Sequence, residues 1–381
     1  MALTAATIAA SALNYLYQVH AAAVLDVATF GLLSTWLARI SVLGAVATVV
    51  QYLSLDFALP DGRWRGLLKA AGLVSLVGVG VHVSLGGALS PLLLGVTAVG
   101  SGVVLYAVLG QLQARLQLGA VGAAALAAAA LRFGLPFAWP AAARAPFFYA
   151  SQAAAPFMGI VAAAAIVSFA PPRPERAGSS GRLRLGRPVL LAFATVLFPL
   201  IDVLFVSSTQ DAATTGAFSR VSLASRVVFF GGAAVLQILL PHELHGAKTG
   251  EPLPRFAVFL QTVLTPGMIG GAIVLAAFAD QFVLHARGSE RTWLYASCLT
   301  AAVLVAILGH VNRFAARDRL RVAGAMVLGV VVTSAFAAGL AALGTGEPVT
   351  RYVLVVLGGD ALVLFVAWAT QMRSPPGPAV R

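Results

Sequence analysis

The sequence predicts an all-α membrane protein with about twelve transmembrane helices in two six-helix bundles. Two observations lead to this prediction. Apolar residues make up 60% of the chain and charged residues only 10%, whereas soluble domains carry about a quarter charged residues. Apolar runs of about 20 residues also recur along the whole chain, and each is long enough to cross a bilayer core of roughly 30 Å as a helix.

The apolar runs define the expected spans in order. The first six are 3–22, 30–53, 66–88, 91–110, 118–138 and 146–169, and the last six are 189–208, 219–240, 257–279, 292–311, 320–343 and 350–370. We therefore expect an N-terminal bundle over 1–170 and a C-terminal bundle over 189–372. The segment 171–188 is basic and rich in Pro and Gly, which is typical of a cytoplasmic linker. The tail 373–381 is expected to be disordered.

The basic residues outside the spans are unevenly divided between the two sides of the membrane. An even number of spans puts both termini on one side, and most of the loop Arg and Lys residues fall on that side. The loop arginines on the other side are Arg144, Arg220, Arg287, Arg291 and Arg351. Because loops rich in Lys and Arg stay in the cytoplasm, both termini are expected there, in a bacterial cytoplasmic membrane. The net charge of +12 therefore gives no sign of nucleic-acid binding.

A polar motif is repeated near the start of each half. The stretches DVATFGLLS (26–34) and DAATTGAFS (211–219) both read D-x-A-T-x-G-x-x-S. The Asp can cap the helix that follows, and the Gly allows helices to approach closely, so we interpret the motif itself as architecture. Its duplication predicts two like-oriented halves related by a pseudo-two-fold axis along the membrane normal. Such repeats are typical of transporters, whose substrate path lies between the halves.

Three charged residues inside spans are candidates for function, because a charge at mid-membrane costs about 2.5–3.5 kcal/mol and usually faces a cavity or a partner. Asp202, three residues after Pro199, is either an ion-coupling or gating site or the partner of an Arg on a neighbouring helix. Arg39 and Arg226 occupy corresponding places in the second and eighth spans. They either bind phosphate oxygens in bidentate fashion or extend toward the lipid headgroups.

Polar residues also form a stripe along the first span. Ser11, Asn14 and Gln18 are spaced so that they share one helix face, where they either line a cavity and bind substrate or hydrogen-bond to a neighbouring helix. Arg132 is expected to be structural or interfacial. Asp360, in the last span, either pairs with an Arg or faces a groove.

Signatures of an enzyme are weak. The sequence contains no Walker A and no G-x-S-x-G motif, and His242, Glu243 and His245 lack the H-E-x-x-H spacing that places two zinc ligands on one helix face. The single cysteine, Cys298, excludes a disulfide within the chain. We therefore expect no enzymatic activity, no metal site and no cofactor.

Two stretches resemble a known family. The sequence LNYLYQVHAAAVLDVATFGLLSTWLARI (13–40) resembles the first two helices of bacterial polysaccharide-biosynthesis membrane proteins, in Asn14 and in the F-G-x-x-S sequence that begins at Phe30. These proteins belong to the multidrug/oligosaccharidyl-lipid/polysaccharide exporter superfamily. The stretch LFPLIDVLFVSSTQDAATTGAFSRVSLASRVVFF (197–230) resembles the start of their second half, in Asp202, Gly216 and Arg226.

The resemblance implies a flippase that moves a lipid-linked oligosaccharide across the membrane by alternating access, for the synthesis of cell-surface polysaccharide. Its expected partners are a polyprenyl-diphosphate-linked glycan, membrane lipids and glycan-polymerising or glycan-transferring enzymes. In this interpretation Arg39 and Arg226 hold the diphosphate, Asn14 and Gln18 contribute to the substrate site, and Asp202 couples an ion or gates the cavity. The alternatives are an ion-coupled drug or metabolite antiporter of the same architecture and a non-transporting membrane scaffold for glycan assembly.

Overall fold

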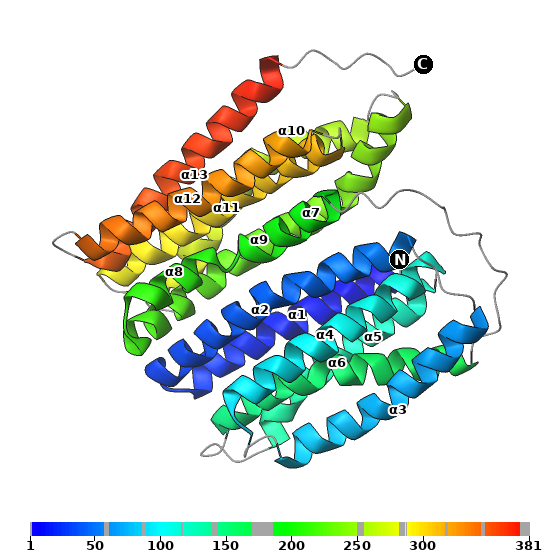
Figure 1. Cartoon of the computed structure of the whole chain (residues 1–381). Coiled ribbons are helices and arrows are strands. Elements are labelled where there is room, and N and C mark those ends of the chain that lie inside the picture. Colours follow the sequence, from blue (N-terminus) through cyan, green and yellow to red (C-terminus); the bar gives the residue numbers. More distant parts are fainter. Residues whose placement is uncertain are drawn as a thin grey trace. The chain divides into compact units, whose positions relative to one another are not determined.

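The computed structural model of the chain describes residues 2–56, 61–85, 89–115, 117–138, 144–169, 186–249, 255–281, 286, 288–316, 319–343 and 347–373. Every regular element in these ranges is helical. The elements are α1 (Ala2–Val24), α2 (Val27–Asp56), α3 (Asp61–Leu85), α4 (Pro91–Ala114), α5 (Leu118–Gly134), the 3₁₀-helix η1 (Leu135–Ala138), α6 (Arg144–Phe169), α7 (Gly186–Leu197), α8 (Ile201–Thr209), α9 (Ala212–Thr249), α10 (Arg255–Ala279), α11 (Ser289–Ala316), α12 (Leu320–Leu343) and α13 (Pro348–Arg373) (Figure 1).

The helices match the expected membrane spans. In the part of the chain that the structure describes, eight helices are long and apolar enough to cross a membrane, and the bent pair α7 and α8 would make a ninth. Each expected span coincides with a helix, apart from 189–208, which we predicted as one continuous span. The all-α fold class is therefore confirmed.

The expected span 189–208 is broken in its middle. Helix α7 ends at Leu197, α8 begins at Ile201, and their axes differ by 58°. Pro199 lies in the break. It has no N–H to donate, and it disfavours helical geometry in the residue before it. The Leu200 amide then donates to the Leu197 carbonyl at 3.0 Å, which closes a tight turn before α8 begins.

The chain divides into two compact units, Met1–Ala192 and Phe193–Arg381. Most of the expected linker 171–188 lies outside the described residues, and its last residues, from Gly186, already belong to α7. The tail 373–381 lies outside them beyond Arg373. The predicted bounds of the two bundles, 1–170 and 189–372, stay predictions.

The first unit is built around α6. This helix contacts α3, α4 and α5, while α1 packs on α5 and α2 packs on α4; α3 lies at one edge of the unit (Figure 1). One apolar core joins Trp64 and Leu68 of α3 to Leu105 of α4 and Ile160 of α6. The burial of these apolar side chains explains why α3 packs against α6.

Helices α2 and α4 approach closely at Gly110. A Cβ atom on Gly110 would lie 2.5 Å from the Gln51 carbonyl oxygen, and a backbone atom cannot move aside cheaply. We expect Gly110→Ala to lower the free energy of unfolding by about 1–3 kcal/mol through overpacking, measured as a lower melting temperature in detergent. The control is Gly100→Ala on the same helix, where nothing lies within 4 Å and alanine favours helix. Equal melting temperatures for both variants would contradict this prediction.

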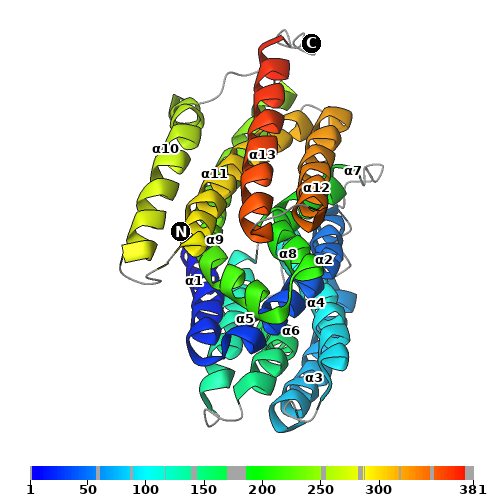
Figure 2. The same ribbon diagram turned by 90° about the vertical axis from the view of Figure 1, so that its left-hand side faces the viewer.

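The second unit is built around α11. In an apolar 18-residue stretch of this helix 83% of the residues are buried, because α9, α10, α12 and α13 all contact the helix. Figure 2 shows α11 between α10 and α13. Helix α12 also contacts α8, and α8 contacts α9. Helix α8 therefore packs against α9 and α12, which both carry buried polar residues.

The repeated motif forms the same helix cap in both units. Asp26 accepts a hydrogen bond from the Thr29 amide at 2.9 Å, and Asp211 accepts one from the Thr214 amide at 2.7 Å. Hydrogen bonds from the Thr29 hydroxyl and amide, and from the Thr214 amide and hydroxyl, hold the pKa of each carboxyl below its usual range, because they favour the charged form. The predicted capping role is thereby confirmed at both positions, which are the exposed starts of α2 and α9.

Candidate functional site

Asp202 lies in the first turn of α8, directly after the break. Its Oδ1 atom accepts a hydrogen bond from the Val203 amide at 2.7 Å, and the residue is partly buried. The break opens the N-terminal end of a helix at this point, where unsatisfied amides and the helix dipole favour a negative charge. Local structure therefore explains how a carboxylate is accommodated within an expected span.

The positively charged residue that interacts with Asp202 is Arg226 of α9. The side chain of Arg226 is buried, and its guanidinium interacts electrostatically with the Asp202 carboxylate. An interaction with an Arg on a neighbouring helix is one of the two roles expected for Asp202, and the choice between them stays a prediction. The pairing also reduces the positive charge that Arg226 can offer to a substrate phosphate.

A second carboxylate of the same unit is more deeply buried. Asp360 of α13 has no exposed surface, and neither of its carboxylate oxygens has a hydrogen-bond partner among the described residues. Helices α12 and α13 approach closely next to it, because Gly359 leaves room for the Thr333 side chain. Asp360 is thus a buried carboxylate within an expected membrane span, next to the close approach of α12 and α13.

Tyr352 lies within electrostatic range of both carboxylates. It is buried on α13 about two turns before Asp360, and its hydroxyl interacts electrostatically with both Asp202 and Asp360. The Ser334 hydroxyl of α12 lies beside the Tyr352 hydroxyl without forming a hydrogen bond of good geometry. We call Asp202, Arg226, Ser334, Tyr352 and Asp360 the C-terminal polar cluster.

The charge of the C-terminal polar cluster determines its chemistry. Asp202 and Asp360 can both be negative, whereas Arg226 is the one cation in the cluster as defined. An unpaired carboxylate in a low-dielectric interior is destabilised by several kcal/mol, and binding a proton or a cation removes that penalty. The cluster can therefore take up and release one positive charge.

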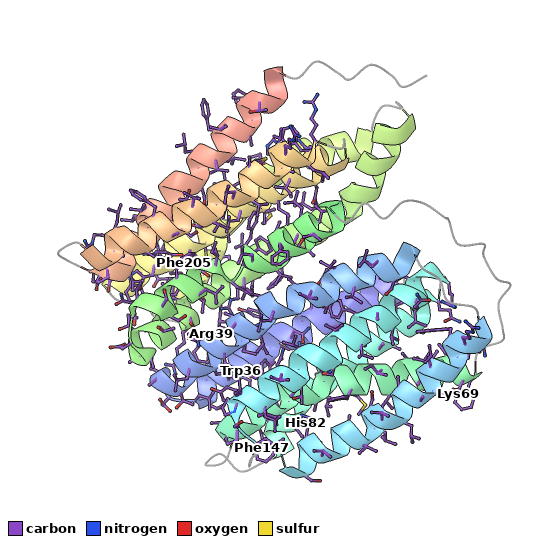
Figure 3. All side chains as sticks on the ribbon, in the orientation of Figure 1. Trp36, Arg39, Lys69, His82, Phe147 and Phe205 are labelled. Carbon is purple, nitrogen blue, oxygen red and sulfur yellow. The ribbon has the colours of Figure 1, made fainter. Side chains whose placement is uncertain are left out.

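The other predicted site residues lie in the first unit. Arg39 is exposed on α2, one turn after Trp36 (Figure 3). Asn14 is partly buried on α1 and accepts a hydrogen bond at 2.6 Å from Nη1 of Arg132 on α5. Gln18 is partly buried one turn further along α1. Because Arg39 and Arg226 belong to different units, their expected shared diphosphate site stays a prediction.

Sequence reasoning missed several partners. It left the role of Asp360 open and did not identify Tyr352, although the two share one side of a helix at i, i+8 spacing. It also gave Arg132 no partner, since Asn14 lies 118 positions away. Within the described residues no group of three or more His, Cys, Asp or Glu could hold a metal ion; the side chains of His242, Glu243 and His245 lie outside that part.

The fold is similar to that of known membrane proteins, although no protein-family model and no curated protein sequence matches the chain. An outward-facing multidrug resistance MATE family transporter of the MOP superfamily superposes with a TM-score of 0.60 and 13% identity, over 98% of this chain and 94% of that one. An inward-facing MATE family transporter of the same superfamily superposes with a TM-score of 0.61 and 12% identity, over 96% and 94%. At these identities the similarity establishes the fold, an all-α membrane protein with two helical bundles.

Proposed function

We propose that this chain is a transporter that flips a polyprenyl-diphosphate-linked oligosaccharide across the bacterial cytoplasmic membrane, coupled to proton or cation exchange at the C-terminal polar cluster. The observation that carries the coupling is Asp360, a fully buried carboxylate whose oxygens have no hydrogen-bond partner among the described residues. Packing alone would favour an apolar residue there, because an unpaired buried charge is destabilising. Intramembrane carboxylates of this kind are typical of ion pathways and proton relays.

Two further observations support transport by alternating access. The fold is similar to transporters solved in both outward-facing and inward-facing conformations. The break at Pro199 places the short helix α8 at the polar cluster, and such broken helices commonly form ion sites in transporters. A change in the charge of Asp202, which lies on α8, would alter the packing of α8 on α9 and α12.

The proposed substrate class comes from the sequence. The stretches 13–40 and 197–230 resemble proteins that export lipid-linked polysaccharide precursors. A second candidate is a drug or metabolite antiporter of the same architecture, favoured by the fold similarity to multidrug resistance transporters. In both cases the C-terminal polar cluster has the same role, and the two candidates differ in what the cavity accepts.

The test is transport by the purified full chain in liposomes. A polyprenyl-diphosphate sugar with a fluorescent label is placed in the bilayer, and its arrival in the outer leaflet is read by a reductant that cannot cross the membrane. We expect faster arrival than in protein-free liposomes, and a further acceleration when a pH or Na⁺ gradient is imposed.

Each alternative has its own outcome in the same liposomes. Movement of a cationic dye without movement of the lipid would favour the antiporter. If neither moves, and cells lacking the chain still lose surface glycan, the scaffold interpretation takes the place of transport.

A further inference from the structure

Among the described residues of the first unit, Arg132 is a buried cation whose charge interacts with no carboxylate. Arg132 lies in the last turn of α5, and its Nη1 atom donates to the Asn14 amide oxygen at 2.6 Å. Its Nε atom is completely buried and has no hydrogen-bond partner among the described residues. Arg226 of the second unit, by contrast, interacts with the Asp202 carboxylate. The Asn14 amide accepts a hydrogen bond from one of the five N–H groups of the guanidinium. Because the amide is neutral, it does not balance the positive charge.

The surroundings of Arg132 offer no carboxylate in the described part of the unit. The groups that interact with its charge are the hydroxyls of Tyr17 on α1 and Tyr106 on α4. Tyr17 is buried, and its hydroxyl already donates to the Phe148 carbonyl of α6 at 2.6 Å. Tyr17 therefore links α1 to α6 and positions Asn14, which lies one turn away. Its hydroxyl proton is already used in this bond and is not available to a bound anion.

The hydrogen bond between Arg132 and Asn14 orients the amide. Because the amide oxygen accepts from Nη1, the amide nitrogen of Asn14 is left as a donor. The guanidinium and the amide N–H group then form a set of donors that carries a full positive charge and is held by two packed helices, α1 and α5. Such a set matches the oxygens of a phosphate group, which arginine binds with paired, charge-assisted hydrogen bonds.

We propose that Arg132 and Asn14 form an anion-binding site within the first unit that takes the phosphate group of a lipid. This inference deepens the proposed function and rests on it for the identity of the lipid, a polyprenyl diphosphate. The same phosphate chemistry can also be supplied by the headgroup of a membrane lipid. In either case the phosphate balances the positive charge of Arg132, as the Asp202 carboxylate does for Arg226.

The experiment measures binding, separately from transport, on the purified full chain in detergent. The probes are a short-chain polyprenyl diphosphate, the corresponding polyprenyl alcohol, and phosphatidylglycerol, and the readout is the melting temperature as each is titrated. We expect the diphosphate to raise the melting temperature more than the alcohol. Arg132→Gln is expected to weaken the apparent affinity for the diphosphate about ten- to hundred-fold. Arg321→Gln is the control, because Arg321 is exposed in the first turn of α12.

Asn14→Asp is the second variant, and it does not depend on Arg132→Gln being able to fold. It places a carboxylate against the guanidinium, so the protein supplies its own anion. We expect the ligand-free melting temperature to be maintained or raised, while the affinity for the diphosphate falls as it does in Arg132→Gln. Wild-type affinity in Asn14→Asp, or an equal response of the wild-type protein to the diphosphate and the alcohol, would overturn the proposal.

The remaining outcomes distinguish the two sources of the phosphate group, and they distinguish failure of the anion-binding site from failure of the proposed transport function. A response to phosphatidylglycerol as strong as that to the diphosphate, lost in Asn14→Asp, identifies a headgroup as the ligand and supports the site. Diphosphate binding that depends on Arg132, in a protein that moves no lipid in liposomes, supports the site while the proposed function fails.

Discussion

The Asp360→Asn variant is expected to melt at or above the temperature of the wild-type protein and to lose ion-coupled transport. Asp360 is fully buried, and its carboxylate oxygens have no hydrogen-bond partner among the described residues. A buried charge without a partner is destabilised by several kcal/mol, whereas an unsatisfied neutral amide costs about 1–3 kcal/mol. The amide has nearly the same shape but cannot take up a proton or balance a cation.

The expected loss of transport follows from the same replacement. An amide at position 360 can neither bind a proton nor balance a cation, so we expect the gradient-driven rate to fall to the rate measured without a gradient. The measurement is the liposome assay with and without an imposed gradient, together with thermal unfolding of the same preparation.

Asp280→Asn is the matched control for Asp360→Asn. Asp280 forms an ion pair at 2.7 Å with Arg291, whose side chain is 64% exposed, and it is not part of the C-terminal polar cluster. We expect its transport rate to remain at the wild-type level. Wild-type transport by Asp360→Asn would remove this carboxylate from the mechanism, and a large fall in its melting temperature would assign it a structural role instead.

The Arg226→Gln variant is expected to be strongly destabilised, and a second substitution is expected to restore it. Losing the guanidinium leaves Asp202 without the cation that interacts with it. Losing the cation that interacts with a partly buried carboxylate is expected to lower the free energy of unfolding by about 1–3 kcal/mol. Arg226→Gln combined with Asp202→Asn removes both charges, so the double variant should unfold at a higher temperature than Arg226→Gln alone.

The double-mutant cycle also distinguishes the two roles considered for Arg226. If the pair has only a structural role, the double variant regains transport together with stability. If Arg226 binds the diphosphate, stability returns and transport does not. Additive effects of the two single substitutions would show that Asp202 and Arg226 do not interact. Arg321→Gln, on the exposed start of α12, serves as the control for loss of an arginine.

The fold was predictable to the extent that its signals are local. A membrane span needs enough consecutive apolar residues, and that information lies within each segment. The caps at Asp26 and Asp211 likewise depend on an acceptor and an amide three residues apart. Pro199 is a residue type that can kink a helix, but the sequence did not show that the span would separate into α7 and α8 with a bend of 58°.

The site was less predictable, because its residues come together over long separations. Asn14 and Arg132 are 118 positions apart, and the C-terminal polar cluster combines residues of α8, α9, α12 and α13. The repeated halves made Arg39 and Arg226 equivalent in the sequence. In the structure Arg39 is exposed and Arg226 is buried, so the equivalence does not extend to their surroundings.

The sequence by itself determined the membrane class, the helical segments and the capped start of each half. Only the tertiary structure decided which side of each helix faces its neighbours, and hence that Arg226 lies with Asp202 while Arg132 lies with Asn14. The physical reason is that lipid is as apolar as a packed helix interface. The periodic contrast that reveals the buried face of a helix in water is therefore weak in these spans, and close packing of small and polar residues selects the partners.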